Sequence, residues 1–334
     1  MCVPASMLPI HLLSTGKALP EQQVTSAELD ARLGHRAGYV RKKSGIDVRH
    51  HATLAEHQSE LAGAAVRDAL RRADVPAASI DLLISASGVQ EQALPNTAAR
   101  ILEPAGLPAG TPAFDVNASC LSFLTALHVA SSLLTTGAYK RIAVVASDLA
   151  SRGIDWNDAE TALIFGDGAA AVIVEAAPSI SGAGIHAYRM ETYPAGKTYC
   201  EIRAGGTRRN PRTGAQPTDY LFHMDGKRVF KLASQLMDGF LDRLFTGSGY
   251  TLRDMHVVVP HQASHLGMQH LRKRLGVPEA SVVDIYAQHG NQVAASIPTA
   301  LHEAVTTQRI EPGKPVLLVG TAAGLTLGGM VLTL

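Results

Sequence analysis

The sequence repeats one order of secondary-structure signals in its two halves. The repeated unit is an apolar strand, a helix closed by a Gly-x-Pro stop, and two later apolar strands. The two copies occupy residues 81–85, 96–108, 141–147 and 165–174, and residues 255–259, 266–278, 315–320 and 325–332. A recurrence on this scale predicts two similar α/β halves, residues 1–177 and 178–334.

Continuous apolar strands that alternate with amphipathic helices are typical of mostly parallel sheets covered on both faces. The helix expected at residues 59–73, for example, places Leu61, Ala65 and Leu70 on one stripe and its arginines towards water. Residues 181–225 are richer in Gly, Thr, Arg and Pro and show little periodicity. We expect a long surface excursion there, which would shape a substrate entrance.

Composition and charge exclude several classes of function. The 334 residues carry 30 basic and 29 acidic side chains, and 46% are apolar, so large cores are possible and nothing indicates a nucleic-acid or membrane partner. Cys2, Cys120 and Cys200 are too few for a disulfide framework and form no Cys-x-x-Cys metal pair. Residues 1–13 lack the charged start of a secretory signal, and no apolar stretch could span a bilayer. We therefore expect a cytoplasmic protein.

Cys120 lies between an expected strand at residues 112–117 and an almost uncharged helix at 121–134. The start of a helix stabilises an anion through its unpaired N–H groups and its dipole, so a thiolate is favoured there. On its own, such a cysteine is more often a small buried hydrophobe in a tight turn, because free cysteines usually belong to the core. The sequence elsewhere decides between a nucleophile and a core residue.

Two later segments favour the nucleophile. His261 ends a β-branched strand, and Asn291 follows a glycine in a loop ahead of an apolar helix. Cys, His and Asn supply a nucleophile, a donor or base, and a neutral donor. Because Asn cannot exchange protons, we expect His261 and Asn291 to polarise a carbonyl group and not to form a hydrolytic triad. His289 reads as a loop residue beside the site, and residues 165–168 as a tight turn.

The chain resembles β-ketoacyl-acyl carrier protein synthase III. The segments that carry the resemblance are Asn-Ala-Ser-Cys at 117–120, Phe-Gly-Asp-Gly-Ala-Ala at 165–170, Pro-His-Gln-Ala at 260–263, His-Gly-Asn at 289–291 and Gly-Leu-Thr-Leu-Gly at 324–328. The resemblance implies a thiolase-like fold, a five-layered α-β-α-β-α sandwich that usually forms a homodimer. It further implies that Cys120 accepts an acyl group, that His261 and Asn291 assist malonyl decarboxylation, and that the N–H groups of Cys120 and Ala323 form an oxyanion hole.

Several positions depart from the family pattern. The two residues that sandwich the adenine of coenzyme A in the family correspond to Tyr39 and Ala159, so usual binding of coenzyme A is in doubt and Tyr39 alone could stack. Leu94 replaces an aromatic residue that the family contributes to the acyl pocket across the dimer, which implies a different pocket. The resemblance also places Lys231, Lys273 and Arg274 where the acyl carrier protein docks, although such charge runs are often only solvated surface.

The function expected from these features is decarboxylative Claisen condensation of an acyl thioester with malonyl-acyl carrier protein to a 3-oxoacyl product. The pathway would be fatty-acid initiation or a related polyketide or specialised route. One alternative is an acyltransferase that moves an acyl group to an alcohol or amine without condensing, and another is a non-catalytic dimeric partner subunit. The substrates would be coenzyme A or phosphopantetheine thioesters, with no cofactor and no metal.

Overall fold

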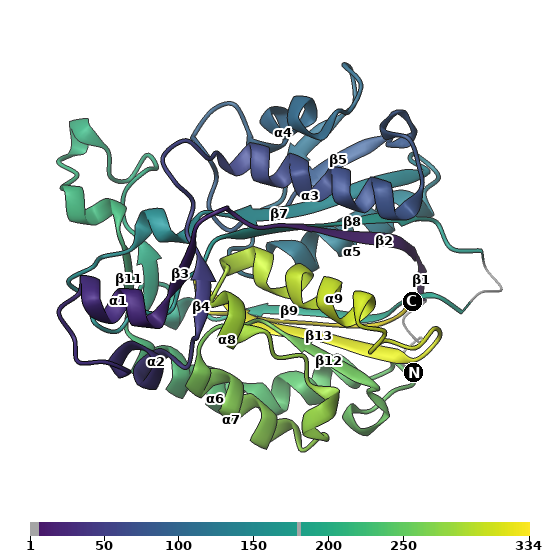
Figure 1. Ribbon diagram of the computed structural model, residues 1–334. Helices are drawn as coiled ribbons and strands as arrows, with labels where there is room; N and C mark the ends of the chain where they lie inside the picture. Colours follow the sequence, from purple (N-terminus) through teal and green to yellow (C-terminus); the bar gives the residue numbers. More distant parts are fainter. Residues whose placement is uncertain (1–6, 179–181) are drawn as a thin grey trace.

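The computed structural model describes residues 7–178 and 182–334 and has five layers, as predicted (Figure 1). Two five-stranded sheets enclose a middle layer of helices, and further helices cover the outer face of each sheet. The described residues do not include residues 1–6, and therefore not Cys2 or the first part of the N-terminal stretch for which no secretory signal is expected. They also do not include residue 181, at which the expected excursion begins.

The two sheets share one strand order. The first sheet runs β2-β8-β7-β5-β6 and the second β1-β9-β14-β13-β12, so that β2-β8-β7-β5 corresponds to β9-β14-β13-β12. The strands of the first sheet are β2 (His11–Ala18), β8 (Gly168–Glu175), β7 (Arg141–Asp148), β5 (Leu82–Ser85) and β6 (Ala113–Asp115). The strands of the second are β1 (Leu8–Pro9), β9 (Gly184–Thr192), β14 (Thr326–Thr333), β13 (Pro315–Ala322) and β12 (Val257–Pro260). The two sheets are therefore similar in topology, and β1 of the second sheet comes from the N-terminal part of the chain.

The prediction of mostly parallel sheets is wrong, because both sheets are mixed. Strand β5 is parallel to β6 and β7, and β12 is parallel to β13, whereas every other neighbouring pair is antiparallel. A turn at residues 323–325 joins β13 directly to β14, and a chain that reverses in so few residues must pair antiparallel. Parallel neighbours occur only where a helical crossover separates the strands.

The prediction of a surface excursion at residues 181–225 is also partly wrong. Its beginning is β9, which pairs with β14 inside the second sheet. The rest does leave the sheet and includes a small ribbon of β10 (Cys200–Ile202) and β11 (Phe222–Met224). This ribbon borders the cavity described below.

Six helices make up the helical layers. The outer helices on the first sheet are α3 (Gln58–Ala73) and α4 (Thr97–Ala105), the middle layer holds α5 (Ser122–Thr135) and α9 (Ser296–Thr306), and the second sheet is covered by α6 (Gly226–Phe245) and α7 (His265–Leu275). Smaller elements include β3 (Gln23–Thr25), α1 (Ser26–Arg32), α2 (Tyr39–Ser44), β4 (Val48–His50), α8 (Tyr286–His289) and the short 3₁₀ helix η8 (Val293–Ala295). Within the described residues, no helix is both long and apolar enough to cross a membrane.

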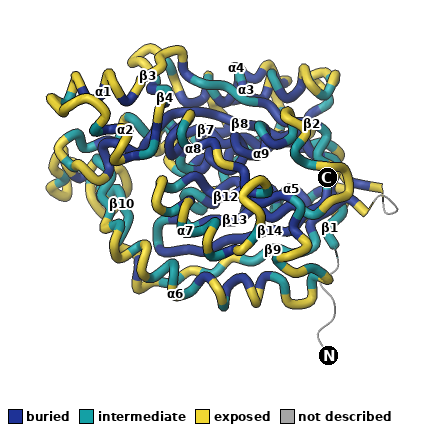
Figure 2. Tube along the Cα trace, turned by 60° about the horizontal axis from the view of Figure 1, so that its bottom comes forward, coloured by how far each residue is buried: buried dark blue, intermediate teal, exposed yellow. Residues whose placement is uncertain are grey.

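The core explains why α5 carries almost no charge. Helices α5 and α9 contact strands of both sheets, and their buried side chains join one apolar cluster with both. Figure 2 shows these buried segments running through the middle of the molecule. Fully burying a side chain such as Leu124 or Leu127 stabilises the fold by about 1.5–3 kcal/mol, and any charge at these positions would lose hydration from both sides. The segments just before α5 and α9 are thereby held in the centre of the molecule.

Candidate active site

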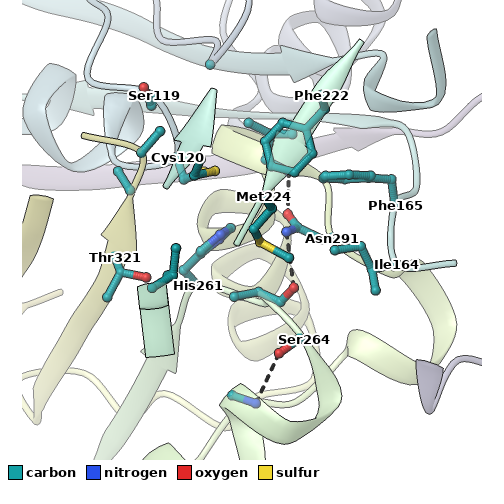
Figure 3. A pocket seen from close by; sticks show the side chains of 18 of the residues that line it. Ser119, Cys120, Ile164, Phe165, Phe222, Met224, His261, Ser264, Asn291 and Thr321 are labelled. Carbon is teal, nitrogen blue, oxygen red and sulfur yellow. Dashed lines mark hydrogen bonds between the residues drawn. The ribbon is translucent and has the colours of Figure 1, made fainter. Parts of the chain in front are cut away.

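A cavity of about 1140 Å³ brings together residues that are far apart in the sequence. Its wall includes Cys120, His261, Asn291 and Ala323, which come from both halves of the chain. Figure 3 shows the side chains of Cys120, His261 and Asn291 around one space, beside the apolar wall formed in part by Phe222. The residues selected from the sequence as nucleophile and donors therefore share one site.

The backbone before α5 places Cys120 at the cavity wall. Ser119 has a φ of 52°, a left-handed conformation that costs a non-glycine residue about 1–3 kcal/mol and persists only where the surroundings hold it. The hydroxyl of Ser122 does so, because it accepts from the Ala118 N–H at 2.9 Å and donates to the Ser119 carbonyl at 2.7 Å. The strained residue directs the chain so that Cys120 faces the cavity.

The surroundings of Cys120 do not favour its thiolate. Burial raises the pKa of the Cys120 thiol, and the nearby Cys200 and Asp148 raise it further, while backbone N–H groups of Ala323 and of Cys120 itself lower it. The net direction is opposite to the one expected from helix placement, because loss of hydration outweighs the helix end.

The turn between β13 and β14 supplies a donor beside the sulfur. The Ala323 N–H donates to the Cys120 thiol, which also receives its own backbone N–H. Two N–H groups that converge on one sulfur would also lie close to the oxygen of an acyl group attached to it. Such a pair has the composition of an oxyanion hole, which the sequence resemblance assigns to these two residues.

His261 lies directly after β12 and is held against the second sheet. Its N–H donates to the Val319 carbonyl at 2.9 Å, and a Cβ on the neighbouring Gly320 would lie 2.7 Å from the His261 Cβ. Only glycine therefore leaves room for the imidazole. Burial lowers the pKa of His261 to about 4, so the ring is neutral at neutral pH and carries a single N–H.

The hydrogen bonds of Asn291 orient its amide. Oδ1 accepts from the Val293 N–H at 2.8 Å, and Nδ2 donates to the Ala263 carbonyl at 3.1 Å. These partners distinguish the oxygen from the nitrogen. Nδ2 has two hydrogens and gives one to Ala263, so the other is available to a ligand in the cavity.

Leu94 and Tyr39, which the sequence suggested as site residues, do not line this cavity. Leu94 is 85% exposed on the surface, so it contributes nothing to the cavity of its own chain. Tyr39 begins α2 and lies against His35, with 4.2 Å between ring centroids, while Lys43 and Ser44 of the same helix reach the cavity wall. Ala159 is exposed in the loop before residue 165.

The basic residues of α6 and α7 differ in how far their charges are already paired. Arg274 forms two hydrogen bonds with the Asp238 carboxylate, at 2.6 and 2.7 Å. Lys231 and Lys273 are exposed and have no ion pair within the part of the chain that is described. Lys273 and Arg274 border the cavity and Lys231 does not. The two lysines are therefore the better candidates for contact with an acidic partner.

The sequence reasoning missed several residues of the cavity wall. Asp148, Cys200, Phe222 and Met224 all line it. Asp148 is the last residue of β7, which is parallel to β5, and the carboxyl ends of parallel strands often carry site residues, so that signal was present in the sequence. The other three belong to the ribbon of β10 and β11, whose place beside the cavity depends on long-range packing. No group of three or more potential metal ligands occurs among the residues that the structure describes.

Comparison with known proteins identifies the family. Models of 3-oxoacyl-[acyl-carrier-protein] synthase III match residues 114–194 and, for its C-terminal part, 245–334, and a thiolase N-terminal domain model matches 47–148. The β-ketoacyl-[acyl-carrier-protein] synthase III of Thiobacillus denitrificans is 36% identical over 96% of this chain and 98% of its own length. The chain belongs to this family.

The β-ketoacyl-[acyl-carrier-protein] synthase III of Rhodospirillum rubrum is also 36% identical, over 96% of this chain and 97% of its own length. A solved synthase III structure from Thermus thermophilus has a TM-score of 0.85 and 33% identity, and the match covers 97% of this chain and 98% of that one. Members of the synthase III family are condensing acyltransferases that use thioester substrates and need no cofactor. The expected family, fold and enzyme class are confirmed.

Proposed function

We propose that this chain joins an acyl thioester to malonyl-acyl carrier protein with loss of carbon dioxide, and that Cys120, His261 and Asn291 carry the reaction. The observation that carries the proposal is the single cavity wall shared by a thiol, a neutral imidazole and an amide with one uncommitted N–H. The family membership supports the same reaction.

In the first half-reaction, the Cys120 sulfur attacks the carbonyl carbon of the acyl donor. The N–H groups of Cys120 and Ala323 hold the oxygen of the tetrahedral intermediate. The carbon–sulfur bond of the donor then breaks, and the proton of the Cys120 thiol leaves with the departing thiol. Because burial raises the thiol pKa, transfer of this proton accompanies the attack.

In the second half-reaction, the malonyl thioester places its carbonyl oxygen against His261 and Asn291. Carbon dioxide leaves, and its bonding electron pair forms an enolate whose oxygen these two neutral donors stabilise. The enolate carbon attacks the acyl group on Cys120, and the bond to sulfur breaks to release the 3-oxoacyl product and a thiolate that regains a proton. Neutral donors suit this step because they remain in place while charge develops.

The experiment that tests the proposal supplies acyl thioesters together with malonyl-acyl carrier protein labelled in its free carboxyl. Release of labelled carbon dioxide and a 3-oxoacyl product identified by mass support condensation. An acyl group transferred to an alcohol or amine without carbon dioxide would favour the non-condensing acyltransferase. Absence of acyl-Cys120 with every donor would favour the non-catalytic partner subunit.

The choice of donor follows from Tyr39 and Ala159. A guanidinium cannot stack at Ala159, and Tyr39 is engaged with His35, so we infer that a carrier protein supplies acyl groups better than coenzyme A does. The double variant Tyr39→Trp with Ala159→Arg should lower the KM for an acyl-coenzyme A donor. An unchanged KM would place the adenine elsewhere.

We infer that the protein works as a cytoplasmic homodimer divided into the halves 1–177 and 178–334. Strand β6 is an edge of the first sheet and pairs only with β5, and exposed edges in native proteins are usually covered. Leu94, 85% exposed, would then reach the acyl pocket of the partner subunit. Sedimentation of the protein and of Leu94→Asp tests this, and a monomer at every concentration would contradict it.

A further inference from the structure

Asp148 is a buried carboxylate without a cationic partner. It ends β7, is 1% exposed, and forms no ion pair with any described residue. Its Oδ1 accepts from the N–H groups of Gly88 and Val89, both at 3.0 Å, and its Oδ2 accepts from the Ala294 N–H at 3.1 Å. Burial raises the pKa of Asp148 to about 7, and the backbone N–H groups oppose that rise because they stabilise the charged form.

The first two donors belong to the loop that supports the nucleophile. The Gly88 carbonyl accepts from Asn117 Nδ2 at 3.2 Å, and the Ser122 hydroxyl shares its one proton between the Ser119 carbonyl at 2.7 Å and the Ser87 carbonyl at 3.1 Å. Asn117 and Ser122 flank Cys120 on either side. Asp148 is therefore one hydrogen bond removed from the segment that presents the thiol.

The third donor belongs to the segment that presents Asn291. Ala294 lies in η8, and the preceding Val293 has a φ of 52°, a strained value for a β-branched residue. The Val293 N–H binds Asn291 Oδ1, and a Cβ on Gly88 would lie 2.4 Å from Val293 Cγ1. The two loops thus touch at Gly88 and Val293, and one carboxylate binds both.

We propose that Asp148 is a positioning residue that fixes the Asn291 amide relative to Cys120 by holding these two loops together. The inference rests on the proposed roles of Cys120 and Asn291. It assigns to Asp148 no contact with substrate, because both of its oxygens are occupied by backbone N–H groups. Its effect should appear in the half-reaction that uses Asn291.

The test compares Asp148→Asn with Asp30→Asn. Asp30 is also buried and accepts two backbone N–H groups, from Gly38 at 2.7 Å and Val40 at 2.8 Å, but it does not line the cavity. Asp148→Asn replaces an acceptor with an NH₂ group that opposes backbone donors. It should reduce kcat for decarboxylation by on the order of 10–100-fold, as small displacements of reacting groups do, and leave the KM for malonyl carrier nearly unchanged. Asp30→Asn should alter the ratio of decarboxylation to self-acylation by less than about twofold.

A double-mutant cycle tests whether Asp148 acts through Asn291. In the Asn291→Ala background, Asp148→Asn should reduce decarboxylation by less than about threefold further, because the amide it positions is absent. An undiminished loss in that background would overturn the proposal, as would equal effects of Asp148→Asn and Asp30→Asn on the ratio. If Asp148→Asn does not fold, Gly88→Ala displaces Val293 from the other side and should change the ratio in the same direction, and an unchanged ratio overturns the proposal.

Hydrogen exchange separates this inference from the proposed function. Asp148→Asn should accelerate amide exchange in peptides that contain residues 88–89 and 293–295, and leave the peptides of α1 unchanged. This measurement does not depend on enzyme activity. A parent protein that fails to decarboxylate malonyl carrier would therefore refute the proposed function but not the link between the two loops. Unchanged amide exchange at residues 88–89 and 293–295 would refute the positioning role of Asp148 even if the enzyme is active.

Discussion

Asn291→Ala should separate the two half-reactions. The substitution removes an N–H donor that no other described residue uses, and a single donor of this kind commonly stabilises developing oxygen charge by about 3 kcal/mol. At about 1.4 kcal/mol for each factor of ten, decarboxylation should fall by on the order of 10²-fold. Self-acylation should persist, because it depends on the N–H groups beside Cys120.

The same substitution should also destabilise the protein. It leaves the Ala263 carbonyl and the Val293 N–H without their partners, and each such group costs about 1–3 kcal/mol if water does not replace the bond. Asn291→Asp is the matched variant, because a carboxyl oxygen still accepts from Val293 while the N–H that faces the cavity is gone. It should lose decarboxylation to a similar extent, and it should also lose stability, because its second carboxyl oxygen then opposes the Ala263 carbonyl.

Both activities are measured on the same preparations. Release of labelled carbon dioxide reports decarboxylation, intact-protein mass after exposure to an acyl thioester reports self-acylation, and thermal unfolding reports stability. A similar loss of both half-reactions in Asn291→Asp would refute the reasoning, since it would mean that Asn291 also acts on the thiol. Unaltered decarboxylation in either variant would remove Asn291 from the mechanism.

Three further outcomes follow from the site. Peptide mapping should find the acyl group on Cys120 and not on Cys200, although both line the cavity, because the Ala323 N–H serves only the former. Decarboxylation should show no loss attributable to protonation of a histidine as the pH falls from 7 towards about 5, because the pKa of His261 is lowered to about 4. Charge reversal at Lys231 or Lys273 should slow reaction with malonyl carrier, spare self-acylation by a small thioester, and matter less as salt rises, since screening acts over about 8–10 Å.

Each of these outcomes has a contrary result. Detection of an acyl group on Cys200 would show that Cys120 is not the nucleophile. A decarboxylation step that fails near pH 6.5 would show that His261 has an ordinary pKa when substrate is bound. Arg274→Glu serves as the control for the lysines, because its guanidinium is already bound to Asp238 and its reversal should affect stability more than encounter with the carrier. Equal rates for parent and lysine variants at low salt would place the docking surface elsewhere.

Local patterns predicted the repeated elements of the fold well. Helix α3 and strands β7 and β13 follow from continuous apolar runs and from helical periodicity, which are properties of short segments. Strand β9 was missed because its sequence, Gly-Ile-His-Ala-Tyr-Arg-Met-Glu-Thr, mixes polar and apolar residues and becomes a strand through pairing with β1 and β14. Strand direction was misjudged for the same reason, since it depends on partners distant in sequence.

For the active site, too, local sequence predicted some properties, and others depend on long-range packing. Cys120, His261 and Asn291 could be chosen from their residue types and local setting, and the structure places all three on one cavity. The direction of the Cys120 pKa shift could not be predicted, because it depends on how deeply other segments of the chain bury the thiol. The place of Asp148 at a strand end could be read from the sequence, but its proposed role could not, since its partners are backbone groups that carry no side-chain signal.

The middle layer of helices has a consequence for how the protein unfolds. Cys120 precedes α5 and Asn291 precedes α9, and each of these helices packs against both sheets. Neither half of the chain could be removed without exposing one face of the helices that present these residues. We therefore expect one cooperative thermal transition, raised as a whole when the cavity is filled by a thioester analogue, and we expect separately produced halves to be inactive until they are mixed.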